Sequence, residues 1–171
     1  TADAIIDGAN LIAKLEADIA RRVLPRHDEV LFDCGGTMVT DRKAAGERIL
    51  RQAFELRLHG GQARQLLGTV NGIDVELSGY EAVDDDGERG IRTSVAALHH
   101  GERNAFEVSD KTRWTTALGR LESSILNLDA ELAAVQADLE ANERRLPAFE
   151  ARLDQEFPDA ALLEDKLREL A

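Results

Sequence analysis

The residues that could hold a metal ion are four histidines, one cysteine and many carboxylates. His99 and His100 are adjacent, so in a strand or turn their side chains point to opposite sides. Neither has a second ligand at the three- or four-residue spacing of zinc sites. The run Asp84-Asp85-Asp86-Gly87 lacks the closing glutamate of an EF-hand loop, because Val95 occupies that position. We therefore expect no metal site, and a solvent-exposed turn at the aspartates.

Gly35-Gly36 could cradle a phosphate only if it continued into GKS or GKT and opened a helix. A strand is expected after it, so it is interpreted as a turn. Cys34 has no histidine in a recognisable catalytic relation, which favours a half-buried strand residue over a nucleophile. Trp114 could stack on a base, but we expect it to pin a long helix to a sheet. No catalytic residue and no cofactor is predicted, and the chain is not expected to be an enzyme.

The basic stretch at 42–64 is the strongest candidate for a phosphate-binding surface. Its possible weak DNA-contact face comprises Arg42, Lys43, Arg48 and Arg51. Glu47 and Glu55 alternate with cations at a spacing of four residues, so on a helix the opposite charges neutralise each other. The chain carries a formal charge of −12, and affinity for DNA begins with neutralisation of phosphates. We therefore expect a solvated face and only weak or indirect DNA contacts.

Residues 118–153 dominate the architecture, because apolar side chains recur there at alternating spacings of three and four. This predicted coiled-coil seam comprises Leu118, Leu121, Ile125, Leu128, Leu132, Val135, Leu139, Leu146, Phe149 and Leu153. Asn142 is the one interruption. An apolar seam of about five heptads is soluble only when another helix covers it. The pattern predicts one long helix over residues 112–156, most of which must project as an arm.

Two arrangements could cover this seam. Pro147 lacks an amide donor and crowds the carbonyl of Glu143, so we expect a kink or break there. If the helix bends only slightly, two copies can pair along the seam; if it reverses, the segment after Pro147 lies back on the first half. We favour the reversed hairpin with some self-association. A final short helix after Phe157-Pro158 and the first helix offer further apolar cover.

The remaining elements follow from periodicity and turn signals. Apolar residues at helical spacing predict a first helix over 3–24, with Asp18, Arg21 and Arg22 among the charged residues between them. Two short strands flank Gly35-Gly36, and Asp41 or Thr40 caps a second helix that ends near His59. Asn71-Gly72 between alternating runs predicts a tight hairpin, and further turns predict an antiparallel meander up to about residue 108.

The predicted fold class is α+β, a small antiparallel meander packed with helices plus a long coiled-coil-like C-terminal arm. The division is an α+β domain at 1–110 and a helical arm at 111–171. The chain starts with Thr1 and its first helix lacks the apolar core of a signal peptide, so we expect a fragment or processed product. No apolar run approaches the roughly eighteen residues of a membrane span. The single cysteine suits a cytoplasmic location.

The order of these pieces resembles the C-terminal region of large bacterial proteins that combine a Swi/Snf-type helicase with an adenine-specific DNA methyltransferase. The matching segments are Phe32-Asp33-Cys34-Gly35-Gly36, Thr40-Asp41-Arg42-Lys43-Ala44-Ala45-Gly46-Glu47, Gly72-Ile73-Asp74-Val75-Glu76-Leu77 and Leu118-Gly119-Arg120-Leu121-Glu122. They cover most of the chain, and the TDRxxAG portion is the distinctive one. The family is typical of phages, plasmids and integrative elements.

The helicase and methyltransferase motifs of that family are missing here. The sequence has no GxGKS/T loop, no DEAH-like motif and no NPPY motif, so no catalytic residue can be carried over from the family. The resemblance implies a noncatalytic accessory domain of a mobile-element DNA-processing protein, whose partner is the rest of a larger polypeptide. The alternatives are a stand-alone coiled-coil assembly module unrelated to DNA, and an enzyme in its own right.

Overall fold

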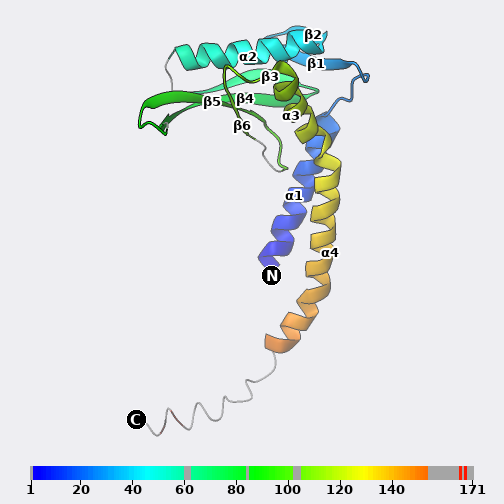
Figure 1. The fold of residues 1–171 in the computed structure, drawn as a ribbon. Helices are drawn as coiled ribbons and strands as arrows, with labels where there is room; N and C mark the ends of the chain where they lie inside the picture. The colour runs from blue at the N-terminus through cyan, green and yellow to red at the C-terminus, as the bar shows by residue number, and fades with distance from the viewer. Residues whose placement is uncertain are drawn as a thin grey trace.

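The computed structural model describes residues 2–59, 63–83, 85–101, 105–153, 166 and 168. The elements in chain order are α1 (Ala2–Arg21), β1 (Glu29–Cys34), β2 (Thr37–Asp41), α2 (Arg42–Leu58), β3 (Arg64–Val70), β4 (Ile73–Val83), β5 (Arg89–Ala97), β6 (Phe106–Val108), α3 (Trp114–Leu126) and α4 (Leu128–Leu153). The strands form one antiparallel sheet in the order β2-β1-β3-β4-β5-β6. This confirms the predicted α+β class. α2 lies along one face of the sheet, and α1 and α4 run side by side away from it as an arm (Figure 1).

The hairpin between β3 and β4 turns at the predicted dipeptide. Asn71 has φ 50° and Gly72 has φ 83°, the left-handed values that a two-residue hairpin of this kind requires. Two neighbouring segments also donate hydrogen bonds to this turn. The Asn71 side-chain oxygen accepts from the Leu31 amide at 2.9 Å, and the Asn71 carbonyl accepts from the Val23 amide at 2.8 Å. The turn therefore holds both β1 and the end of α1.

The position of β1 in the sheet was not predicted. The hairpin of β1 and β2 does not stand apart, because β1 pairs with β3 through Phe32 opposite Val70 and Asp33 opposite Thr69. A glycine permits this approach: a Cβ on Gly68, whose φ is 141°, would lie 1.9 Å from the Asp33 carbonyl oxygen. The predicted meander of β3 to β6 is thereby extended to six strands.

The core lies between the sheet and the helices α2 and α3. It includes fully buried Phe32 and Leu77 from the strands and Ile49 from α2. Asp41 caps α2 as predicted, because its carboxylate accepts from the Ala44 amide at 2.7 Å. Trp114 is partly buried against this core, and it packs against Gly46 of α2, where an added Cβ would lie 2.9 Å from the tryptophan Cβ.

The long C-terminal helix differs from the prediction in where it bends. It divides at Asn127 into α3 and α4, and α4 runs through Pro147 without a break. The predicted reversal into a hairpin after Pro147 is therefore wrong. Glu143 and Pro147 are both exposed, so water can bond to the carbonyl that proline leaves without a donor. The predicted break at Phe157-Pro158 and most of the final short helix lie outside the described residues.

On the arm, the seam is partly covered by α1 instead. α1 runs antiparallel to α4 (Figure 1), and an added Cβ on Gly8 would lie 3.4 Å from Leu139. α3 belongs with the sheet core and α4 with the first helix of the chain, while the predicted division at residue 110 stays a prediction. In the part of the chain that the structure describes, no helix has the length and apolar character needed to cross a membrane.

Candidate functional site: the junction between the arm and the sheet

The predicted seam residues fall into two environments. Leu118, Leu121, Ile125 and Leu128 are at most 1% exposed, and the first three belong to the sheet core. The next group lies on the arm and is half-buried: Leu132, Val135, Leu139 and Leu146. Phe149 is 43% exposed, and the side chain of Leu153 lies outside the described part. The available apolar surface is therefore on the distal arm, beyond the bend.

A buried carboxylate joins α1 to the loop after β5. Asp18 is 1% exposed, and it accepts hydrogen bonds from the His100 amide at 2.7 Å, from His100 Nδ1 at 2.8 Å and from Arg21. Burial by itself would raise the pKa of Asp18, but these donors outweigh it and hold the pKa below its ordinary value. The carboxylate thus stays ionised and fixes the C-terminal part of α1 against the loop.

The adjacent histidine of that loop contacts α3. His99 Nε2 lies 2.6 Å from the Ser124 hydroxyl, and both residues are 3% exposed. The Glu131 carboxylate of α4 and His99 Nδ1 both border the place that a Cβ on Gly101 would occupy, at 1.7 Å and 3.1 Å. The two histidines contact different helices, His99 contacting α3 and His100 contacting α1.

The Ser124 hydroxyl, the His99 imidazole and the Glu131 carboxylate follow one another in the order of the catalytic triad of serine hydrolases. A depression of about 660 Å³ beside Ser124 is lined by residues of α3 and by Phe106, over whose ring Arg120 lies at 5.3 Å. However, Ser124 is almost fully buried in the last turn of α3, where the backbone amides donate to carbonyls within the helix and cannot form an oxyanion hole. The cluster is therefore interpreted as a buried link between three elements.

One arginine spans the bend between α3 and α4. The Arg22 side chain is 8% exposed; it donates to the Ile125 carbonyl of α3 at 3.2 Å and pairs with Asp129 of α4 at 2.7 Å. Next to it, Arg21 lies 3.7 Å from Asp74 of β4. The last turn of α1 and the residue after it thus contact α3, α4, the sheet and the loop, and they hold the arm at its bend.

The predicted DNA-contact face is largely compensated by nearby carboxylates. Arg42 makes a two-point contact with Glu122 of α3, at 2.5 and 2.6 Å, and Lys43 lies 3.8 Å from Glu47. Arg48 and Arg51 line one shallow depression together with Glu47 and Glu55. The structure brings the four cations onto the same helix but interleaves them with acids. Their role in DNA contact stays a prediction.

The other candidates are dispersed. Cys34 is half-buried at the end of β1, and the Asp33 carboxylate accepts from the Gly36 amide at 2.9 Å, as expected of a turn. Asp84 lies outside the described residues. Among the residues described, no three histidine, cysteine or acidic side chains gather in a group that could hold a metal ion.

The junction was not predicted from the sequence. Asp18 was placed among the charged residues between apolar positions, and Arg22 likewise. A signal was present, because Asp18 stands three residues after Leu15 and next to Ile19, on the apolar side of α1. A charge on that side is buried only when a partner is supplied, and the partner comes from residue 100.

Comparisons with protein-family models, with curated proteins and with solved structures find no match to this chain. The resemblance to helicase and methyltransferase proteins therefore stays a prediction.

Proposed function

We propose that this chain is a noncatalytic interaction domain of a larger DNA-processing protein, in which the sheet domain is a base and the arm makes contact. The observation that carries the proposal is the arm itself. α1 and α4 form a two-helix extension whose distal Phe149 is 43% exposed, while Leu118 and Leu121 of the same heptad pattern are buried in the base. An apolar seam that continues beyond the core is suited to binding another helix.

The polar junction supports the same role. A projecting arm can hold a partner in a fixed position only if its attachment is rigid. Asp18 and Arg22 attach α1 and α4 by contacts at 2.7–2.8 Å, and His99 links the loop after β5 to α3 at 2.6 Å. These groups are buried or engaged with one another, which favours a structural role for them over a chemical one. The link to DNA processing rests on the TDRxxAG resemblance at residues 40–46.

Two measurements test this proposal. The coding sequence upstream of Thr1 should continue in frame into helicase and methyltransferase motifs; an unrelated or closed frame would leave only the assembly module unconnected to DNA. Calorimetric titration of the chain with ATP and with S-adenosylmethionine should give no saturable heat. Saturable binding of either one would contradict the noncatalytic assignment.

A further inference from the structure

We infer that the surface of the arm is completed by the arm of a second copy of this chain, packed antiparallel to the first. This inference rests on the proposed function, because it names the partner of the arm. The seam of the arm, from here the arm seam, comprises Leu132, Val135, Leu139, Asn142, Leu146 and Phe149. α1 leaves these residues half-buried or exposed, so part of each side chain is available to another helix.

The intervals between the residues of the arm seam are the same in either chain direction. The intervals are three, four, three, four and three residues, so an antiparallel second copy can be placed with its seam in register. In that register Leu139 lies opposite Asn142 of the second copy and Val135 lies opposite Leu146. The polar Asn142 then meets an apolar residue at the centre, where it can reach solvent between the two arms.

Charge selects this orientation. The residue before each leucine of the seam forms one edge of α4, from here the charged edge: Glu131, Asp138, Arg145 and Arg152. Its first half is acidic and its second half is basic. In the antiparallel register Asp138 lies beside Arg145 of the second copy, and the reverse pair forms by symmetry, whereas parallel copies would place each charge against itself. Asp138, Arg145 and Arg152 are exposed.

The other edge of α4 does not offer this complementarity. The residues that follow Leu128, Val135, Asn142 and Phe149 are Asp129, Gln136, Glu143 and Glu150, so an antiparallel copy there would oppose acid to acid. Arg22 already pairs with Asp129 at the junction. Charge complementarity therefore favours the charged edge over the other edge as the side for a second arm, giving an antiparallel four-helix bundle.

The size of the contact sets its strength. The charged edge from 131 to 152 is about 33 Å long at 1.5 Å per residue, and two helices are about 20 Å wide. Each copy would contribute on the order of 600 Å², near the lower limit for specific protein interfaces. Self-association in the micromolar range is expected, since the net charge of −12 also opposes it.

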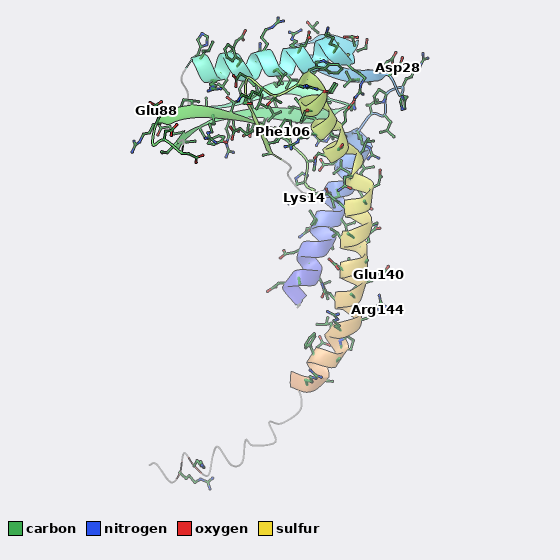
Figure 2. The ribbon with its side chains drawn as sticks, in the orientation of Figure 1. Lys14, Asp28, Glu88, Phe106, Glu140 and Arg144 are labelled. Atoms are coloured by element: carbon green, nitrogen blue, oxygen red, sulfur yellow. The ribbon has the colours of Figure 1, made fainter. Side chains whose placement is uncertain are left out.

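Sedimentation equilibrium of the full chain tests the inference. The wild-type mass should rise from 18.8 kDa toward twice that value as the concentration increases from about 1 to 200 µM. Asp138→Arg and Arg145→Asp should each weaken association about tenfold, because each sets two like-charge pairs across the interface. The double variant Asp138→Arg/Arg145→Asp should restore it to within about threefold. Asp28→Arg is the matched control, because it makes the same charge change at an exposed site outside the arm (Figure 2).

Cross-linking supplies an independent readout of orientation. In a Cys34→Ser background, Asp138→Cys/Arg145→Cys should form covalent dimers on oxidation, and the single Asp138→Cys should not. The two positions are about 10 Å apart along one helix, too far for a disulfide within a chain. Dimers from the single variant would show a parallel arrangement and overturn the inference. A wild type that stays monomeric at 200 µM, or a double variant that fails to restore association, would also overturn it, but would leave the proposed function to be decided by the upstream reading frame.

Discussion

Asp18 shows how a single ionised side chain fixes the position of a helix. It is almost completely buried, yet its three hydrogen bonds keep it charged and tie α1 to the loop that carries His99 and His100. Because the folded-state pKa is below the ordinary value of 3.8, the unfolded chain takes up the proton more readily. The stability from Asp18 is therefore fully present above about pH 5, and it is lost as the pH falls through the folded pKa.

Replacing Asp18 by Asn should lower the free energy of unfolding by about 1.5–3 kcal/mol at pH 7, since charged hydrogen bonds are lost at a buried site. The difference between wild type and variant should shrink as the pH is lowered from 5 to 3. Urea denaturation at a series of pH values measures this. Asp7→Asn, at an exposed position of the same helix, is the control and should change little at either pH. A penalty for Asp18→Asn that did not depend on pH would show that the charge is not what holds the helix.

The hairpin glycine gives a second test. Gly72 has φ 83°, and a Cβ there would lie 2.2 Å from the Arg21 carbonyl oxygen. Gly87 has φ 81° with open space around it. Gly87→Ala should therefore cost about 1–2 kcal/mol from the left-handed backbone alone. Gly72→Ala should cost more, because α1 must also move. Thermal unfolding of the two variants compares them, and equal losses would mean that the end of α1 does not pack tightly on the turn.

The elements differ in how far the sequence determined them. Asn71-Gly72 and Asp41 act through their own backbone and neighbours, so the hairpin and the α2 cap were predicted from local chemistry. The bend at Asn127 was not, because the heptad pattern passes through that residue without interruption, from Ile125 to Leu128. Leu121 and Leu128 satisfy the same spacing whether they face another helix or a sheet. Only packing against the sheet decides which of the two environments a leucine faces. The burial of Asp18 and His99 likewise depends on packing between segments that are distant in the sequence.

The division of the long helix can be measured directly. Leu121→Ala, in the core, should destabilise the whole protein by about 2–5 kcal/mol. Leu139→Ala, half-buried on the arm, should cost about 1–2 kcal/mol. Hydrogen exchange should show faster exchange of α1 and α4 amides in Leu139→Ala while the β3 and β4 amides keep their protection. Loss of protection in the strands would mean that arm and base unfold as one unit.

The molecule as a whole combines a compact base with a narrow extension (Figure 1). Its acidic charge is distributed over both, and the cations of α2 are interleaved with Glu47 and Glu55 or paired with Glu122. Such a surface repels a polyanion at long range and offers few cations at short range. We therefore expect contacts with proteins rather than with nucleic acid.

Binding of duplex DNA by the isolated chain should accordingly be weak and independent of sequence, with a Kd above about 10 µM at 150 mM salt. Fluorescence anisotropy with two unrelated duplexes measures it. Arg48→Glu/Arg51→Glu should have little effect, because both cations already lie near acids. A submicromolar Kd that this double variant abolished would instead establish α2 as the DNA-contact face.

The pairing of α1 with α4 also has a consequence for biosynthesis. α1 is made before α4, and the whole sheet is made between them. At about 5–20 residues per second, the ribosome exposes the amphipathic first helix roughly 5 to 20 seconds before its covering helix exists. Asp18 lacks its partner until the loop after β5 is made, and the apolar side of α1 lacks α4 for the whole interval. During this interval α1 is the segment that is most vulnerable to aggregation and most open to a chaperone or a neighbouring copy.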